Sequence, residues 1–557
     1  MIRRLTAVFC LLSVISLYRT SDSYAQSDPS GQRRVTDLYA ITNAQIVTSP
    51  GSDAFTGTIL IKNGLISAVG KNVTIPKGAQ VIKGDSLFIY PGFIDMGSQS
   101  GVKKPEEVKH PENLDPSNPP NEIAGISPES SVLDYWKAHE ETMEWRKSGF
   151  TMVQLLPQGQ MLPGNTALVI LGDQSSNNII RENTGLYAQF ETHRGLYPGT
   201  TLGIMAKFRE LYKNAELQST HESQYGSDQD GIRRPELDHS LSAFYPVINK
   251  ESPIIFRTEQ ALEIRRAIKL QEELGFGLTL FNVKETADLD AILKESSANL
   301  ILSLDLPEDK AFKQDMEGAT EEAKTSHKRV EEAYKKALSQ AGQLEKADIK
   351  FAFTTYGVKK QEVLKNIQKM IENGLSTDAA LEALTSTPAR MLNIDKYSGS
   401  IASGKMANLV ISDAPIFSKD AFIHYVMADG YLYEFDADKS KNGVKDADKI
   451  AGKWSYTSET PGGESQGEIR FEKKGENLTG EIDVDNPNGG GTITRELENI
   501  SFDGKNLSFS FSIQVQGEEL TVNTKGLVEG DKFDGSISIR DMGTYSLKAE
   551  KRPSTTF

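Results

Sequence analysis

The chain has 557 residues, which is longer than one ordinary domain and allows a large buried core. Hydrophobic residues make up 38% of it and charged residues 25%, a composition typical of folded proteins rather than disordered chains. Its formal net charge of -15 would repel phosphate backbones, which argues against a nucleic-acid partner.

The N-terminus has the features of a cleaved secretory signal. Arg3 and Arg4 precede an apolar run, residues 5–17, that is too short to span a bilayer comfortably. Small residues follow, and we predict cleavage near Ala25 and secretion into the periplasm of a Gram-negative bacterium; the alternative is a retained anchor. The only cysteine, Cys10, lies inside this segment, so the predicted mature chain has no disulfide and no thiolate metal site. No later stretch is apolar enough to predict a membrane span.

Apolar and polar residues alternate over 38–89, which predicts β-strands, with Asn63-Gly64 as a hairpin turn. Residues 103–130 are rich in proline, asparagine and glutamate and predict a long loop.

From residue 131 the pattern alternates between helix and strand. Helices are predicted over 131–149, 259–275, 286–298, 308–346, 359–374 and 376–393. Strands are predicted over 150–157, 252–260, 276–283, 299–307 and 348–357. Such alternation predicts parallel βα units, and therefore an α/β fold, either an open sheet or a (β/α)8 barrel.

The C-terminal part returns to β patterns. Residues 450–557 contain a weak repeat in which a glycine turn, at Gly475, Gly504 and Gly530, precedes alternating apolar positions. This repeat predicts an antiparallel meander, as a small barrel or a sandwich. Trp454 is interpreted as a core residue rather than a ligand contact.

Three blocks resemble the amidohydrolase superfamily, in its imidazolonepropionase-like and dipeptidase-like branch. They are "NAQIVTSP" with "TILIKNGLISAVG", then "YPGFID", and finally "ALEALTSTPARMLNIDKYSGSIASGKMANLVISD". The resemblance implies a TIM-like (β/α)8 barrel beside a small composite β domain. The predicted organisation is a signal peptide over 1–25, a composite β domain from 38–89 and 399–436, a barrel over 90–398, a linker over 437–449 and a C-terminal β domain over 450–557.

The resemblance also implies hydrolysis of carbon–nitrogen bonds with zinc or another divalent metal. In the family, histidines follow strands one, five and six, an aspartate follows strand eight, and a lysine on strand four often bridges two metals. The aligned positions here hold other residues: Gly97 and Gln99 after strand one, Arg257 after strand five, Asn282 after strand six, and Thr355 or Tyr356 after strand eight. The strand-four lysine has no assigned counterpart. Glycine cannot ligate a metal, and a guanidinium repels a cation.

The histidine content agrees with this alignment. The chain contains seven histidines, and none forms an H-x-H pair or follows a predicted barrel strand: His110, His139, His193, His221, His239, His327 and His424. We therefore predict a degenerate member of the family that uses no metal or other cofactor.

Other polar residues are expected near the barrel mouth. Asp95 and Glu259 could act as acid and base, with Arg257 as an anchor for a substrate carboxylate. The alternative, which we favour, is that Arg257 and Glu259 neutralise each other where a metal would lie. Gly159 and Gly164 are predicted in a loop after the second strand, either near the site or only as turn residues.

Three functions remain open from the sequence. The first is a non-catalytic binding or assembly subunit, in a homo-oligomer or beside a metal-competent amidohydrolase. The second is a hydrolase of a small amide that uses a rearranged site. The third is ligand or partner binding through the C-terminal β domain.

Overall fold

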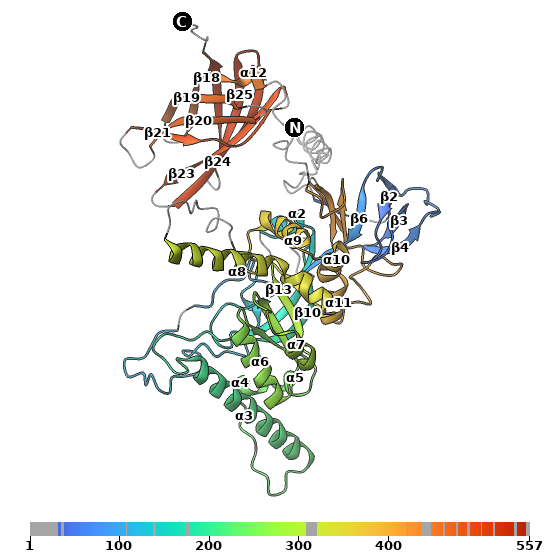
Figure 1. Ribbon diagram of the computed structural model, residues 1–557, viewed down its shortest axis with the longest axis vertical. Helices are drawn as coiled ribbons and strands as arrows, with labels where there is room; N and C mark the ends of the chain where they lie inside the picture. The colour runs from blue at the N-terminus through green and yellow to red at the C-terminus, as the bar shows by residue number, and fades with distance from the viewer. Residues whose placement is uncertain are drawn as a thin grey trace, which may run out of the picture. The chain divides into compact units, whose positions relative to one another are not determined.

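The computed structural model describes residues 32–34, 38–106, 108–137, 141–172, 178–307, 320–419, 421–428, 430–435, 447–460, 463–474, 477–486, 491–502, 504–515, 518–539 and 543–552. The predicted signal peptide, with Cys10, lies outside these residues, as does most of the predicted linker. The chain divides into two compact units, Met1–Phe435 and Asp436–Phe557 (Figure 1).

One sheet of the first unit is built from two distant parts of the chain. Its strands are β1 (Gln32–Arg34), β2 (Leu38–Ile46), β3 (Phe55–Lys62), β4 (Leu65–Gly70), β5 (Gln80–Lys83), β6 (Phe88–Pro91), β15 (Leu409–Ser412), β16 (Ile423–Ala428) and β17 (Tyr431–Glu434). Their order is β1-β17-β16-β15-β6-β2-β3-β4, and β5 pairs with β2. The two parts join where β6 runs antiparallel to β15. Asn63 and Gly64 form the predicted hairpin turn between β3 and β4, and both have the positive φ, 51° and 72°, that this turn needs.

The second sheet forms the barrel. Its strands are β7 (Phe93–Ser98), β8 (Phe150–Leu155), β9 (Gly164–Ile170), β10 (Ile179–Gln189), β11 (Ile254–Arg257), β12 (Leu278–Val283), β13 (Asn299–Ser303) and β14 (Ala352–Thr354). They pair in chain order. The hydroxyl of Thr354 on β14 donates to Gly97 O on β7 at 2.7 Å, which links the last strand to the first. The predicted fold class, a TIM-like barrel with a composite β domain, is confirmed.

The strand β9 corrects one prediction. It runs antiparallel to both β8 and β10, whereas the sequence pattern predicted only parallel units. Residues 156–163, which connect β8 to β9, are too few for a parallel crossover, which needs a dozen or more residues. Gly164 therefore begins a strand and does not lie in the predicted loop.

Helices surround the barrel strands. They are α2 (Glu141–Lys147), α3 (Thr201–Ser227), α4 (His239–Ser242), α5 (Tyr245–Ile248), α6 (Ala261–Leu274), α7 (Asp290–Ser296), α8 (Glu321–Lys346), α9 (Val363–Glu372), α10 (Thr377–Leu384) and α11 (Ser386–Met391). The helix predicted over 131–149 is observed as an α-helix only over Glu141–Lys147; nearer its start a short 3-10 helix spans Val132–Asp134, and Trp136 forms an isolated β-bridge with Val102. The first part of the helix predicted over 308–346 falls on 308–319, outside the described residues.

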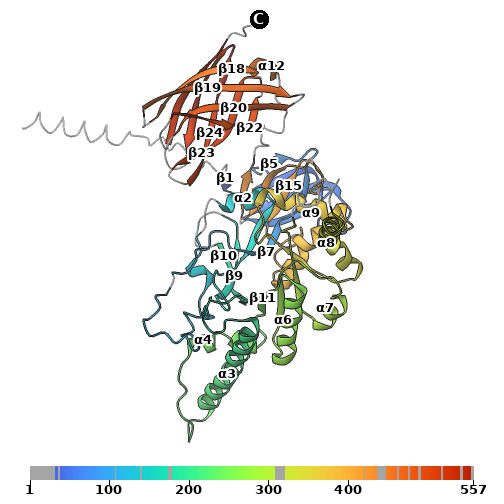
Figure 2. The ribbon, with the colours of Figure 1, turned by 60° about the vertical axis from the view of Figure 1, so that its left-hand side comes forward.

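The second unit is an antiparallel meander, as predicted. Its strands are β18 (Gly452–Thr460), β19 (Gly463–Lys474), β20 (Asn477–Asp485), β21 (Thr492–Glu496), β22 (Glu498–Phe502), β23 (Asn506–Val515), β24 (Glu518–Glu529), β25 (Lys532–Ile539) and β26 (Gly543–Lys551), preceded by α12 (Ala447–Ile450). Leu497, which alone separates β21 from β22, donates its N–H to Gly480 O at 2.8 Å, so the sheet curls into a barrel (Figure 2). Trp454 is buried and donates its Nε1 hydrogen to Ile450 O at 2.8 Å, which confirms its role in the core.

No helix within the described parts of the chain is long and apolar enough to cross a membrane.

Candidate functional site

The aligned family positions lie at the C-terminal ends of the barrel strands. In the observed sheet order β10 is the fourth strand, β11 the fifth, β12 the sixth and β14 the eighth. The fourth strand, IIRENTGLYAQ, contains no lysine, so the bridging lysine of the family has no counterpart on it. Active sites of such barrels are built at these strand ends.

Asp95 of β7 is held against β14, inside the barrel. Its side chain is 1% exposed and accepts hydrogen bonds from Thr355 N at 3.0 Å, from Gly97 N at 3.1 Å, and from the Thr355 hydroxyl. Burial raises the pKa of Asp95 to about 7, and these hydrogen bonds limit the rise. The carboxyl group therefore links the first and last strands, and its own hydrogen bonds occupy it.

The space beside Gly97 is filled by an aromatic ring. A Cβ atom on Gly97 would lie 2.2 Å from Cε2 and 2.5 Å from Cζ of Phe281, on β12. Phe281 is fully buried and makes T-shaped ring contacts with Tyr187 at 6.0 Å and with Tyr356 at 5.6 Å between centroids. Phe281, within this cluster of three rings, therefore fills the space beside Gly97, the residue that the sequence analysis aligned with the first histidine of the family.

A line of alternating charges crosses the ends of the neighbouring strands, and we call it the charge chain. Arg257 Nη1 lies 2.5 Å from Glu191 Oε1, and Arg257 Nη2 lies 2.6 Å from Glu259 Oε1. Lys284 Nζ then lies 3.3 Å from Glu259 Oε2 and 2.8 Å from Asp305 Oδ2. The chain runs from just after β10 to just after β13, and each inner charge has opposite charges on both sides.

Mutual neutralisation sets the ionisation of these groups. Burial opposes the charge of Glu259, but hydrogen bonds and attraction from Arg257 and Lys284 outweigh it, so the pKa of Glu259 is lowered. Burial likewise opposes the charge of Lys284, and Asp305 and Glu259 raise its pKa nonetheless. For Arg257, the hydrogen bond to Glu259 raises the pKa against the effect of burial. Arg257, Glu259 and Lys284 therefore stay charged at neutral pH, which does not suit Glu259 to general acid–base work.

Asn282 takes part in the same network through one end of its amide. Its Nδ2 donates to Glu259 Oε1 at 3.0 Å, while its Oδ1 is buried with no partner among the described residues. The residue has φ of 58°, a conformation that non-glycine residues rarely adopt and that often occurs at functional positions.

The predicted site residues thus separate into two groups. Hydrogen bonds join the first group, which consists of Asp95, Gly97 and Thr355. The second group consists of Arg257, Glu259, Asn282 and Tyr356, and in it the guanidinium of Arg257 lies 5.2 Å from the centroid of the Tyr356 ring. Gln99 instead donates to Pro157 O at 3.1 Å.

The Gly159 loop reaches the charge chain through a residue that the sequence analysis missed. Gln189, at the end of β10, donates to Gly159 O at 2.5 Å and to Gln160 O at 2.6 Å. Its Oε1 accepts from Arg257 Nη1 at 3.4 Å. Glycine is needed at 159 because φ is 153°, and at 164 because a Cβ would lie 2.4 Å from Ser130 O.

Glu191, Lys284, Asp305, Tyr187 and Phe281 were also missed. A signal was available for three of them, because Glu191, Lys284 and Asp305 each stand within two residues of a strand end.

The residues present do not fit the metal site of the family. Among the described residues, no group of three or more histidine, cysteine, aspartate or glutamate side chains could hold a metal ion. His110 and His193 lie near each other, with ring centroids 5.4 Å apart, and His139 is outside the described residues.

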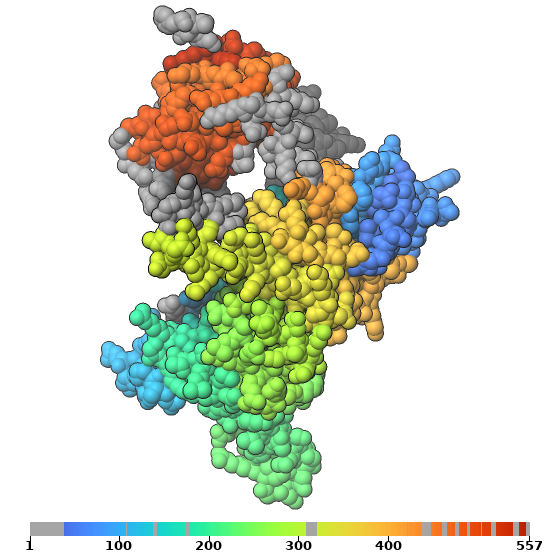
Figure 3. All heavy atoms as spheres, viewed as in Figure 1, coloured from blue at the N-terminus to red at the C-terminus, as the bar shows by residue number. Residues whose placement is uncertain are grey.

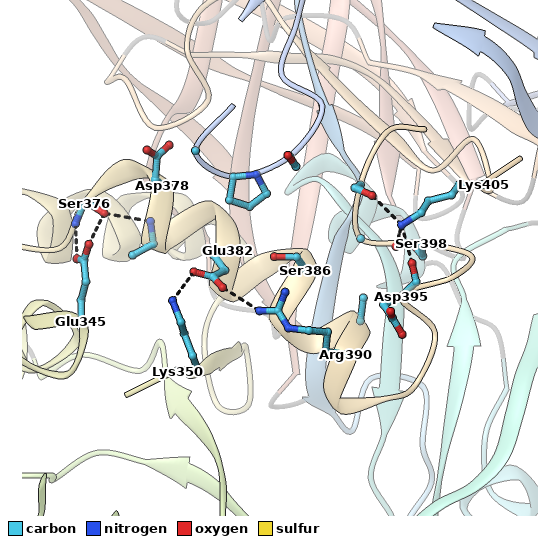
Figure 4. Close-up of a pocket in the computed structure, with 17 residues that line it drawn as sticks. Glu345, Lys350, Ser376, Asp378, Glu382, Ser386, Arg390, Asp395, Ser398 and Lys405 are labelled. Carbon is cyan, nitrogen blue, oxygen red and sulfur yellow. Dashed lines mark hydrogen bonds and ion pairs between the residues drawn. The ribbon is translucent and has the colours of Figure 1, made fainter. Parts of the chain in front are cut away.

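A separate hollow of about 530 Å³ lies among α10, α11 and the segment 395–405, and it shares no lining residue with the charge chain (Figure 4). The lysine and arginine side chains that line this hollow bind other residues of its lining. Lys350 and Arg390 both bind Glu382, at 3.1 and 2.8 Å. Lys405 Nζ donates to Asp395 O, Ser398 O and the Ser400 hydroxyl, which pins the turn of the G-S-I-x-x-G-K motif. We interpret this hollow as structural.

Comparison with known proteins agrees with the fold. Residues 267–444 match the model of the "Amidohydrolase family". An amidohydrolase from Thermotoga maritima MSB8 is similar in structure, with 20% sequence identity and a TM-score of 0.57, over 70% of this chain and 98% of that one. A Xaa-Pro dipeptidase with bound methionine in the active site has 16% identity and a TM-score of 0.43, over 72% of this chain and 100% of that one. A comparison with curated proteins finds no match. The chain thus matches the amidohydrolase family model over residues 267–444 and shares the barrel fold of the Thermotoga maritima amidohydrolase.

Proposed function

We propose that this protein is an exported, metal-independent member of the amidohydrolase superfamily that acts as a binding subunit rather than as a metallohydrolase. The observation that carries the proposal is the packing of Phe281 against Gly97. A Cβ on Gly97 would lie 2.2 Å from that ring, so a histidine cannot stand there without displacement of the ring cluster.

The charge chain supports the same function. A divalent metal in this fold needs carboxylates and imidazoles with free lone pairs. Arg257 takes the place of one histidine and binds Glu259, whose Oε1 also accepts from Asn282. The positive charges of Arg257 and Lys284 stand in for the positive charge that a metal would supply.

Metal analysis of the purified secreted protein tests this proposal. We expect less than about 0.1 equivalent of zinc, manganese, iron, cobalt or nickel by mass spectrometry after dialysis without chelator, because no described cluster offers three ligands. A stoichiometric divalent metal would contradict the proposal. N-terminal sequencing of the same sample tests cleavage near Ala25.

A second candidate is a hydrolase of a small amide with a rearranged, metal-free site. One observation favours it, namely that burial raises the pKa of Asp95 to about 7, where a carboxyl can exchange protons near neutral pH. Against it, Asp95 is 1% exposed and hydrogen-bonded to Thr355 and Gly97, so a substrate has no access to it. Activity of the wild type on dipeptides, lactams or hydantoins that is lost in Asp95→Asn would establish this function.

The C-terminal unit is a third candidate for partner binding. Two proteins test whether the second unit binds a partner: the full chain and a chain that ends at residue 435. Their size in solution and the proteins they pull down are compared, because the two units are compact separately. Loss of a partner on truncation assigns the contact to the second unit, and retention assigns it to the first.

A further inference from the structure

A cavity of about 1300 Å³ lies at the C-terminal ends of β12 and β13. The loop after β12, the segment 303–307 after β13, and helix α8 form its walls. Lys284 and Asp305, the last two members of the charge chain, both line it, whereas none of the aligned metal positions does. It is therefore a site at the functional face of the barrel, separate from the position where the family binds metal.

One wall of the cavity is apolar. Val330, Ala333 and Ala337 of α8 line it at helical spacings of three and four, which places them on one face of the helix. Leu306 adds to this surface from the other side. Val330 is 42% exposed, so the helix presents apolar area that nothing in the described structure covers. Helix α8 extends from the rest of its unit in the surface view (Figure 3).

The remaining lining is mainly acidic. Among the described lining residues, the carboxylates are Glu285, Asp288, Asp290 and Asp305, and the cations are Lys284 and Lys336. Lys284 is already bound to Glu259 and Asp305. Asp288 and Asp290 form no ion pair with another described residue. The cavity therefore attracts a cation more strongly than an anion.

The acidic loop is held in place before any ligand binds. Thr286 N donates to Gln340 Oε1 on α8 at 3.1 Å, and Ala261 N donates to Glu285 Oε2 at 3.4 Å. Asp288 has φ of 61° and lies in the turn that follows these anchors, which Leu289 N closes on Thr286 O at 3.1 Å. A preformed wall of this kind loses little conformational entropy on binding.

We propose that this cavity binds a small organic cation with an apolar body, such as an arylalkylamine or a compact hydrophobic amine. The ammonium group binds at Asp288 and Asp290, and the apolar body covers Val330, Ala333 and Ala337. This inference rests on the proposed binding function and names the chemical class of the ligand.

Isothermal titration of the full secreted chain with three matched probes tests the ligand class. The probes are 4-phenylbutylamine, 4-phenylbutanol and 4-phenylbutyrate, which share the apolar body and differ in charge. We expect saturable binding of the amine, weaker binding of the alcohol and weakest binding of the acid. The preference for the amine should shrink at high salt because exposed charges are screened. Absence of binding, or acid binding equal to amine binding, would overturn the proposal.

Matched variants locate the binding. Asp288→Asn should weaken amine binding about fivefold, whereas Asp348→Asn should not, although both positions have positive φ and accept asparagine equally well. Ala333→Trp should weaken it at least about tenfold by filling the cavity, whereas Ala323→Trp, on the same helix and outside the cavity lining, should not. Equal effects within each pair would overturn the assignment to this cavity.

The outcomes separate this inference from the proposed function. A metal-free protein that binds none of the probes contradicts the cavity inference alone. A protein that carries stoichiometric metal and binds the amine contradicts the metal-independent function alone.

Discussion

The ring of Phe281 occupies the space into which a side chain at Gly97 would project. A Cβ on Gly97 would meet Phe281 Cε2 at 2.2 Å and Leu156 Cδ1 at 3.0 Å, and both neighbours are fully buried. The barrel interior therefore depends on the absence of a side chain at Gly97, the residue that the sequence analysis aligned with the first histidine of the family.

Gly97→Ala tests this relationship directly. We expect it to lower the free energy of unfolding by about 1–3 kcal/mol, because the added methyl overpacks a closed core. Denaturant unfolding followed by circular dichroism measures it. Gly226→Ala is the control, since nothing lies within 4 Å of a Cβ there and alanine in a helix is neutral or stabilising.

The double variant Gly97→Ala with Phe281→Leu, together with the two single variants, forms a double-mutant cycle. A smaller side chain at 281 should relieve the clash, so the two changes should not be additive, with a coupling above about 0.5 kcal/mol. Strict additivity would show that the two residues do not compete for one space.

Arg257→Ala tests the charge chain. Its removal leaves Glu191 without a cation and Glu259 with Lys284 alone, and we expect a loss of about 2 kcal/mol in unfolding free energy, between the values for exposed and for buried pairs. Adding Glu259→Gln to the Arg257→Ala variant should recover part of the lost unfolding free energy. Arg209→Ala is the matched control, because Arg209 binds Glu273 at 2.6 Å at a more exposed position, where ion pairs contribute less than about 1 kcal/mol. Equal losses in the two variants would contradict a special role for Arg257.

Asp95 predicts a particular pH dependence of stability. Its pKa is raised from 3.8 to about 7 in the folded state, mainly by burial. Between pH 4 and 7 the folded protein keeps a proton that the unfolded chain has lost, so this group contributes stability at low pH that declines as the pH rises. Over this pH range the contribution of Asp95 to the free energy of unfolding falls by at most about 4 kcal/mol, and it is constant above pH 7.

Urea unfolding of the wild type and of Asp95→Asn at pH 4.5 and 7.5 measures this contribution. The difference between the two variants isolates Asp95 from the other carboxylates, such as Glu259, whose lowered pKa acts in the opposite direction. We expect the asparagine variant to gain stability relative to the wild type at the higher pH. A difference that does not depend on pH would show that Asp95 does not titrate in this window.

The buried hydrogen bond of Trp454 lies within the second unit, so we expect that its loss destabilises this unit and not the first. Trp454→Phe removes the hydrogen bond to Ile450 O and leaves that carbonyl buried, at a cost of about 1–3 kcal/mol. Calorimetry of the full chain should show one transition lowered and the other unchanged, because the units are compact separately. Trp136→Phe, in the first unit, is the control and should leave the transition of the second unit in place.

The sequence by itself predicted strands and helices from local patterns, and its resemblance to a known family predicted the barrel and the composite sheet. Alternation of apolar residues predicted β2 to β6, and the turn at Asn63-Gly64 follows from residues that accept positive φ. The identity of Arg257 at a strand end already argued against a metal, since a guanidinium is always charged. The helix α3 could also have been predicted from the sequence, because Ile204, Phe208 and Leu211 recur at helical spacing.

Only the tertiary structure decided what fills the barrel mouth. Phe281 and Gly97 are far apart in the sequence, and no local pattern reports that the ring of one enters the space of the other. The same holds for Lys284, whose two carboxylate partners come from the ends of β11 and β13. The antiparallel course of β9 was also hidden, because periodicity fixes which residues are buried in a strand but not the direction in which the strand runs.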